Sequence, residues 1–377
     1  MAIRVRTLPD VHPWVEQVAN YIHDPVKRLR FLKAVAPAMA ERKVSERGHG
    51  GRWLLAAAMA AGALLAGFWW LHPGARASAP EVRQPAAAPA AGTQPPGNPD
   101  VWPVERSGNA ETYSNGLRVD NRFVTATHAR SYLAFPAHRW QAAERRTQPA
   151  GMVFHTTESR QAPFEARENG ELKRIGESLL EYVRRRRSYN FVIDRFGRVY
   201  RVVPEDQAAN HAGYSLWADG EWAYLNLNES FLGVSFEAET RQPEISPAQV
   251  RSGAMLIEML RSRYRIAAAN CVTHAQVSVN PSNMRVGYHM DWAAGFPFEA
   301  MGLPDNYAAP LPALWQFGFE WDGAFGTAAG SRLRAGVDDA ESRLAEDARA
   351  AGLTAAAYRK LLRKNYRELL AEVRRAE

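Results

Sequence analysis

The chain has 377 residues and a net charge of +7, which is long enough for one sizeable domain together with further segments. The positive charge favours anionic partners such as acidic polymers or lipid head groups. No zinc knuckle, helix-turn-helix pattern or RNA-binding aromatic motif accompanies this charge, so nucleic acid is set aside as a partner. The single cysteine, Cys271, excludes an intrachain disulfide framework. Its apolar neighbours predict a buried strand residue rather than a thiol ligand or nucleophile.

The first part of the chain predicts a membrane anchor. Residues 1–52 hold ten Lys and Arg against five Asp and Glu, and nothing in them indicates a function. Residues 53–71 form an uncharged apolar stretch of nineteen residues, which as a helix crosses a hydrocarbon core of about 30 Å. Basic residues before it and tryptophans at both ends predict a single-pass span of the cell inner membrane, with the rest of the chain in the periplasm. A cleaved signal peptide is the alternative, but its leader would be unusually long.

Three further segments flank the central region. Residues 72–103 are rich in proline and alanine, which predicts a semi-extended tether. Residues 104–148 regain aromatic side chains, and we expect an N-terminal extension that packs on the following domain and contains no catalytic residue. Residues 308–377 predict a C-terminal helical extension. Within it, residues 354–376 carry an apolar stripe, favoured to pack on the same domain rather than to bind a partner.

The central region, residues 149–307, alternates between strand and helix patterns. The strand patterns are an apolar run that ends at His155, a hairpin FVIDRFGRVYRVV around Gly197, and LGVSFEAE. Amphipathic helix patterns cover about residues 167–187 and 247–264, and the Gly- and Trp-rich piece after NHAG predicts loops. This order predicts an α/β fold with a mixed central β-sheet flanked by helices, preceded by the membrane helix.

The segment Thr273–Phe298 gathers side chains that bind metals. It is rich in Asn, Pro, Gly and Ser, which is typical of an irregular loop, and it contains His274, His289 and Asp291. A further candidate, His155, stands at the end of the first strand of the central region. Catalytic zinc takes three protein ligands of the His, Asp, Glu or Cys type and leaves one position open. Two histidines and an aspartate fit that pattern.

Five motifs occur in the order GMVFHTTES, SYNFVIDRFGRVYRVV, NHAG, LNESFLGVSFEAE and THAQ…HMDWAAGFPF. With them the chain resembles the zinc-dependent N-acetylmuramoyl-L-alanine amidases, the type 2 amidase and peptidoglycan recognition protein family, over about residues 147–307. The resemblance implies a Zn²⁺ ion held by His155, His274 and Asp291. The loop before Asp291 is longer than in the family. His289 as the third ligand, with Asp291 orienting it, stays the alternative.

The resemblance also implies the other residues of the site. His289 matches a position where the family carries a polar group that steadies the transition state. Tyr189 matches a phenol that hydrogen-bonds the attacking water or the oxyanion. His211 matches a histidine that lines the substrate groove. Cytosolic anhydromuropeptide amidases of the family place a catalytic glutamate where this chain has Ser235. The nearest carboxylate, Glu237, is the candidate general base, and without it His289 carries the proton transfers.

These residues imply a peptidoglycan hydrolase that cuts the amide bond between N-acetylmuramic acid and L-alanine of the stem peptide, with water activated by zinc. Its expected partners are peptidoglycan and muropeptides, together with the cytoplasmic membrane through residues 53–71. The alternative is a membrane-anchored module that binds peptidoglycan without cutting it, which Ser235 and the altered loop favour. A third possibility is a scaffold in which residues 1–52 and 311–377 recruit partners.

Overall fold

A computed structural model describes residues 101–377 apart from 138, 141, 242 and 243. All of them belong to one of the two units into which the chain divides, Pro80–Glu377. The predicted span of residues 53–71, the segment before it and most of the linker lie outside the described residues. Within the described part, no helix combines the length and the apolarity that a membrane crossing requires. The domain boundaries and the inner-membrane location stay predictions.

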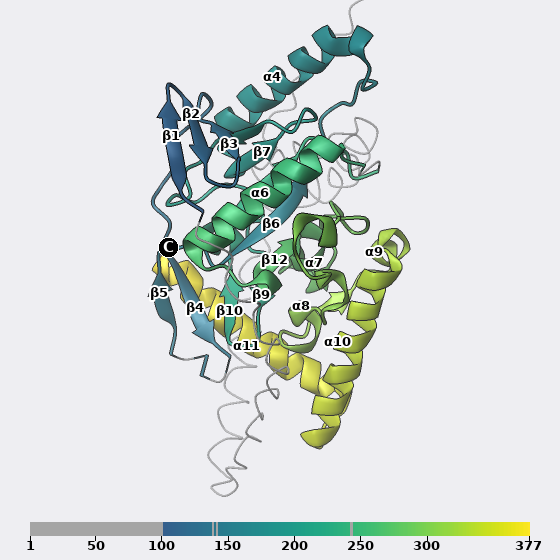
Figure 1. The fold of residues 1–377 in the computed structure, drawn as a ribbon. Coiled ribbons are helices and arrows are strands. Elements are labelled where there is room, and N and C mark those ends of the chain that lie inside the picture. Colours follow the sequence, from purple (N-terminus) through teal and green to yellow (C-terminus); the bar gives the residue numbers. More distant parts are fainter. Residues whose placement is uncertain (1–100, 138, 141, 242–243) are drawn as a thin grey trace, which may run out of the picture. The chain divides into compact units, whose positions relative to one another are not determined.

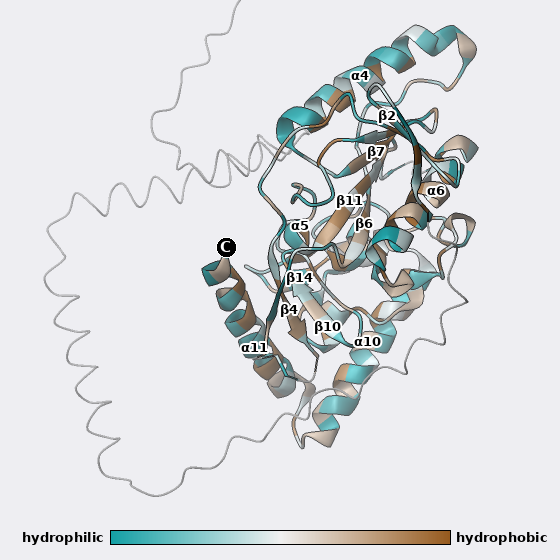
Figure 2. Ribbon diagram, turned by 60° about the vertical axis from the view of Figure 1, so that its left-hand side comes forward, coloured by the Kyte–Doolittle hydropathy of each residue, from teal (hydrophilic) through white to brown (hydrophobic). Residues whose placement is uncertain are grey.

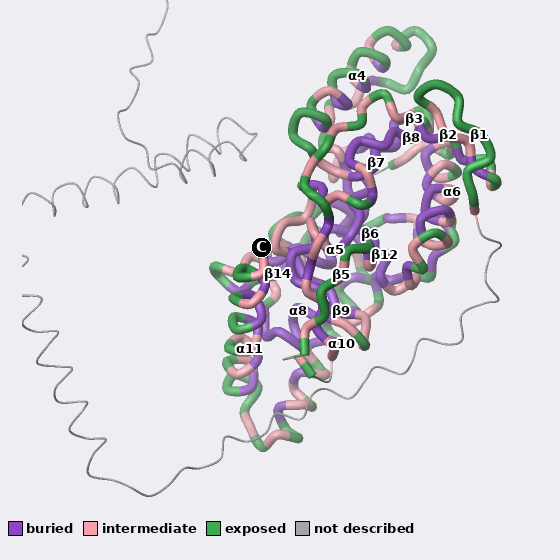
Figure 3. Tube along the Cα trace, turned by 90° about the vertical axis from the view of Figure 1, so that its left-hand side faces the viewer, coloured by how far each residue is buried: buried purple, intermediate pink, exposed green. Residues whose placement is uncertain are grey.

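A mixed sheet of eight strands lies at the centre of the described part (Figure 1). Its order is β1-β2-β3-β8-β7-β11-β6-β12, and β6 pairs in parallel with β11 on one side and β12 on the other. The strands are β1 (Pro103–Ser107), β2 (Ala110–Tyr113), β3 (Arg118–Asp120), β6 (Gly151–Thr156), β7 (Phe191–Ile193), β8 (Val199–Arg201), β11 (Phe231–Phe236) and β12 (Cys271–Thr273). Every residue of β6 and β11 is buried, as expected of parallel strands covered on both faces (Figure 3).

Two helices cover opposite faces of this sheet. Helix α6 (Pro247–Tyr264) begins after Ser246, whose hydroxyl caps it by accepting the backbone N–H of Gln249 at 3.1 Å. Helix α4 (Asn169–Arg186) packs Val183 and its neighbours on Val192 of the other face. Figure 2 shows the apolar strands β6 and β11 lying between these helices. The predicted α/β class, with a mixed central sheet and flanking helices, is confirmed.

A second sheet corrects one prediction. It has the order β5-β4-β10-β9, with β4 (Tyr132–Pro136), β5 (Glu144–Arg146), β9 (Leu216–Ala218) and β10 (Trp222–Leu225). The sequence predicts loops in the piece that forms β9 and β10. That prediction is wrong, because the two strands are only three and four residues long, and β9 pairs with β10 while β10 pairs with the distant β4.

The C-terminal part packs on the same unit. Helix α10 (Ser331–Ala350) contacts helix α11 (Ala355–Ala376), and α11 contacts strand β4. The predicted apolar stripe of α11 is buried, which confirms that it packs on its own domain. The remaining short elements are η1 (Ala166–Glu168), α5 (Leu227–Ser230), η2 (Ala268–Asn270), α7 (His274–Val277), β13 (Val279–Asn280), β14 (Arg285–Val286), η3 (Glu299–Met301), η4 (Asn306–Ala308), α8 (Pro312–Trp315), β15 (Glu320–Trp321) and α9 (Gly323–Ala328).

Candidate metal centre

The first candidate ligand, His155, stands on β6, which lies between β11 and the edge strand β12 of the sheet. It is the fifth residue of β6 and is 1% exposed. Its register partner on β11 is Ser235, and on the other side β12 pairs with β6 one residue earlier, through Phe154 and Thr273. Hydrogen-bonded strands on both sides therefore fix the backbone of His155. The ends of parallel strands are where ligands bind in open α/β sheets.

The second candidate, His274, follows directly after β12 at the same edge of the sheet. It opens the short helix α7, whose start is held by the Gln276 side chain, since Oε1 accepts the Thr273 backbone N–H at 2.9 Å. The carbonyl of Asp291 accepts the backbone N–H of Ala275 at 3.2 Å. This bond attaches the third candidate to the beginning of the same helix.

Aromatic packing holds the segment that follows Asp291. Trp292 has a φ of 58° and is buried, and its carbonyl accepts the Tyr307 hydroxyl at 2.8 Å. Phe296 stacks on Phe154 of β6, with 4.3 Å between ring centroids and 14° between ring planes. The two phenylalanines of the AAGFPF motif thus anchor the loop to the sheet, because Phe298 also lies edge-on against Phe154. This packing sets the position of Asp291.

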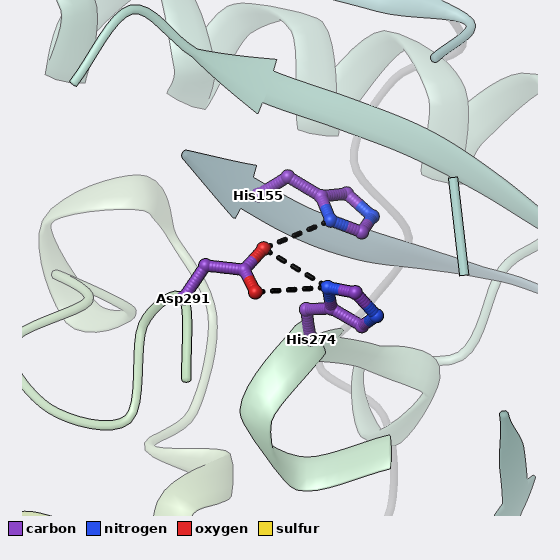
Figure 4. Close-up of side chains that lie close together, drawn as sticks. All are labelled: His155, His274 and Asp291. Atoms are coloured by element: carbon purple, nitrogen blue, oxygen red, sulfur yellow. Dashed lines mark hydrogen bonds and ion pairs between the residues drawn. The ribbon is translucent and has the colours of Figure 1, made fainter. Parts of the chain in front are cut away.

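The three side chains converge, as Figure 4 shows. Asp291 Oδ2 lies 3.0 Å from Nδ1 of both His155 and His274, and Oδ1 lies 2.9 Å from Nδ1 of His274. One ligand atom from each residue lies within 4.8 Å of the other two. Two imidazole nitrogens and one carboxylate oxygen in a buried site are the donor set of catalytic zinc centres, so these residues fit a zinc ion.

Electrostatics give the ligands the protonation states that metal binding needs. Burial, followed by the charge of His274, lowers the pKa of His155 to about 4. Burial works against ionisation of Asp291, but the neighbouring His274 and His155 outweigh it and hold the pKa of the carboxyl well below its usual value. At neutral pH the site therefore presents a neutral His155 imidazole and an ionised carboxylate.

His289 lies beside the three converging residues and not among them. Although the residue as a whole is exposed, its ring stacks on His274 at 4.5 Å and 19°. Desolvation, followed by the charge of His274, lowers the pKa of His289 to about 4. The carboxylate of Asp291 thus faces the imidazoles of both His155 and His274, whereas His289 contacts only the ring of His274.

Tyr189 lies beside His155. The centroids of the two rings are 5.1 Å apart. Its φ of 58° is rare for an aromatic residue and indicates a constrained position. Burial and the charge of Asp291 raise the pKa of the phenol, so it stays a hydrogen-bond donor at neutral pH.

The structure does not bring Glu237 to the converging residues. The carboxylate is buried, and its Oε2 accepts the Arg195 backbone N–H at 3.2 Å, at the turn between β7 and β8. Burial raises its pKa, and the charges that act on it belong to Arg195, Asp194 and Arg198. Two residues along a strand amount to about 6 to 7 Å, which separates Glu237 from Ser235 and therefore from His155.

His211 lies against the first candidate ligand. Its Nδ1 lies 3.1 Å from Nε2 of His155, and its Nε2 lies 3.2 Å from the carbonyl oxygen of Phe231. Both ring nitrogens of His211 therefore lie within hydrogen-bond distance of protein groups, and its role in binding substrate stays a prediction.

Two residues that support the site have no counterpart in the sequence predictions. Arg130 is 1% exposed and donates to the Phe231 carbonyl at 3.1 Å. The Asn228 side chain accepts the backbone N–H groups of the NHAG loop. An arginine or an asparagine in a polar stretch carries no local pattern that marks such a role, so only the fold reveals it. Cys271 is buried in β12, and burial raises its pKa to about 12, as its predicted structural role requires.

Comparison with known proteins gives the same family as the motifs. Residues 145–285 match the family model described as N-acetylmuramoyl-L-alanine amidase (Amidase_2). The amidase AmiD of Escherichia coli K12 is 29% identical over 89 residues, which are 22% of this chain and 31% of that protein. The chain thus spans about a third of the length of this curated relative.

Two solved structures are similar at low identity. The amidase LysC of Clostridium intestinale URNW is 22% identical over 41% of this chain and 83% of that chain, with a TM-score of 0.27. AMPDH3 of Pseudomonas aeruginosa is 18% identical over 41% of this chain and 58% of that chain, with a TM-score of 0.31. The family match contains His155 and His274 and ends six residues before Asp291. Residues 145–285 belong to the Amidase_2 family of N-acetylmuramoyl-L-alanine amidases, and the chain carries a candidate His/His/Asp metal site there and just beyond.

Proposed function

We propose that the protein is a zinc-dependent N-acetylmuramoyl-L-alanine amidase. In this proposal it hydrolyses the amide bond between the lactyl group of N-acetylmuramic acid and L-alanine of the peptidoglycan stem peptide. The observation that carries it is the convergence of His155, His274 and Asp291, with one ligand atom of each within 4.8 Å of the others. The family match over residues 145–285 and the AmiD relative support the same bond specificity.

The chemistry divides between the metal and the side chains around it. A zinc ion in this site supplies a Lewis acid and a water whose pKa falls to about 7. The Tyr189 phenol, 5.1 Å from the His155 ring, donates a hydrogen bond to the oxygen on which charge develops. The imidazole of His289, which stacks on His274, takes up and returns the proton that the leaving amine needs.

A release assay tests the proposal. The full chain, purified with zinc, is expected to release stem peptides from isolated peptidoglycan, with L-alanine at the new amino terminus in the mass spectrum. Replacing His155 with Ala removes one ligand and should abolish release, while an exposed histidine, His128→Ala, serves as the matched control. Release that persists in His155→Ala would overturn the proposal.

One observation favours a second function, a module that binds peptidoglycan without cutting it. Ser235 is the register partner of His155 and lies beside Tyr189, so the position next to the site carries a hydroxyl and not a carboxylate. Under this alternative the wild-type chain pellets with insoluble peptidoglycan and releases no peptide. The release assay therefore separates the two functions.

We further propose, from the sequence, that residues 53–71 anchor the protein in the inner membrane with the amidase domain in the periplasm. The uncharged stretch and its basic flank support this location. The expected result is recovery of the full-length chain in the inner-membrane fraction, with the C-terminal part digested by protease added to spheroplasts. Full-length protein in the soluble fraction would contradict it.

A further inference from the structure

A hydrogen-bond chain runs from a backbone carbonyl to the first candidate ligand. The Phe231 carbonyl oxygen can only accept, so the His211 Nε2 atom 3.2 Å away must carry a proton and donate it. A neutral His211 then has a lone pair on Nδ1. That lone pair faces His155 Nε2 at 3.1 Å, so His155 carries its proton on Nε2.

This assignment leaves Nδ1 of His155 without a proton. Nδ1 is the atom that lies 3.0 Å from the Asp291 carboxylate, which is also only an acceptor. A neutral imidazole has one N–H and here faces two acceptors, His211 on one side and Asp291 on the other. A cation between Nδ1 and the carboxylate resolves this conflict, since both atoms then donate lone pairs to it.

The surroundings of His211 keep its ring in this place. The Asn228 side-chain oxygen accepts the backbone N–H groups of His211, Ala212 and Gly213 at 2.8, 2.7 and 2.8 Å, which fixes the loop. A Cβ atom at Gly233 would lie 2.7 Å from Cγ of His211, so only glycine lets the ring lie against strand β11.

The accepting carbonyl is held in turn by the N-terminal extension. The guanidinium of Arg130 donates to the carbonyl oxygens of Phe231 at 3.1 Å, Glu205 at 3.1 Å and Gln207 at 3.0 Å. Arg130 lies before residue 145, where the family match begins. Support for the ligand therefore comes from a part of the chain to which the sequence assigns no role in the site.

We propose that His211 is a positioning residue, which fixes His155 in the tautomer that offers Nδ1 to the metal, and that Arg130 secures this arrangement through the Phe231 carbonyl. The inference rests on the proposed zinc site. It replaces substrate binding as the role of His211, because both ring nitrogens already contact the protein.

Zinc affinity of the full chain, measured by competition with a chromophoric chelator, tests this role without relying on activity. His211→Leu removes both hydrogen bonds and should weaken zinc binding about 10- to 100-fold, the usual cost of losing such a partner. In His211→Asn the amide oxygen can take the place of Nδ1 as the acceptor, so affinity should stay close to that of the wild type. The control His128→Ala changes a histidine that pairs with Glu229 at the surface and should leave affinity unchanged.

Three outcomes are distinguishable. Wild-type affinity in His211→Leu, with a raised KM for muropeptide, would overturn the positioning role and restore substrate binding, while the proposed amidase stands. Wild-type protein that binds no zinc would remove the proposed function and this inference with it. Should His211→Leu fail to fold, long-range ¹H–¹⁵N spectra of the zinc-loaded wild type decide the matter. A proton on Nε2 of His155 supports the inference, and a proton on Nδ1 overturns it.

Discussion

The two halves of the candidate site are held in different ways. His155 belongs to the sheet, with hydrogen-bonded strands on both sides and His211 behind its ring. His274 and Asp291 belong to the segment Thr273–Phe298, and the Nε2 atom of His274 is buried with no hydrogen-bond partner among the described residues. Strand pairing and the hydrogen bond to His211 therefore hold His155, the sheet half of the site. Aromatic packing on Phe154 holds the segment with His274 and Asp291, the loop half.

The largest expected effect comes from the loop half. Asp291→Ala removes the carboxylate that Nδ1 of both His155 and His274 face at 3.0 Å, so the protein should lose its zinc to an equimolar chelator and its peptide release entirely. Asp291→Asn keeps one oxygen without its charge and should retain a weakened site. Elemental analysis after dialysis gives the zinc content. Full zinc occupancy in Asp291→Ala would make His289 the third ligand and show that the loop half is arranged differently.

A smaller effect is expected at His289, which contacts a ligand without converging on Asp291. His289→Ala should lower kcat about 100-fold, a common value for a lost acid-base group, with zinc affinity nearly unchanged. Its exposed neighbour supplies the matched control, Tyr288→Phe. A lowered kcat with nearly unchanged zinc affinity is the reverse of the result expected for His211→Leu, in which zinc affinity falls. If His289→Ala lost as much zinc as Asp291→Ala, His289 would have to be counted as a zinc ligand and not as a neighbour of one.

Local sequence patterns correctly predict the elements that hold the sheet half of the site. The run that ends at His155 forms β6, Gly197 turns the β7–β8 hairpin with a φ of 78°, and Ser246 caps α6. Each depends on residues within a few positions of one another. Strand β9 pairs instead with β10, and β10 pairs with β4, nearly ninety residues earlier in the chain. Local patterns do not reveal this pairing, so the sequence predicts loops here.

The ligand residues were predictable from motif order, and their support was not. Family resemblance names His155, His274 and Asp291 because their residue types and order are kept. The place of His211 depends on the Phe231 carbonyl and on the missing side chain of Gly233. Both residues belong to strand β11, and only folding brings this strand next to His211. Arg130 has no recognisable pattern at all. Sequence reasoning thus named the three side chains that converge and missed the residues that hold them in place.

The smallest effect on activity is expected at Glu237, which directly follows β11 and accepts a hydrogen bond from the β7–β8 turn. Burial raises its pKa, so as the pH rises above 4.5 the unfolded chain ionises before the folded one, and the folded state loses stability until the raised pKa is passed. Glu237→Gln removes this cost and keeps an oxygen for the Arg195 N–H. Its stability relative to the wild type should therefore increase with pH over that range in urea unfolding, while peptide release stays unchanged. If Glu237→Gln instead abolished release with zinc still bound, Glu237 would be the general base after all, and the sheet half would supply catalysis as well as a ligand.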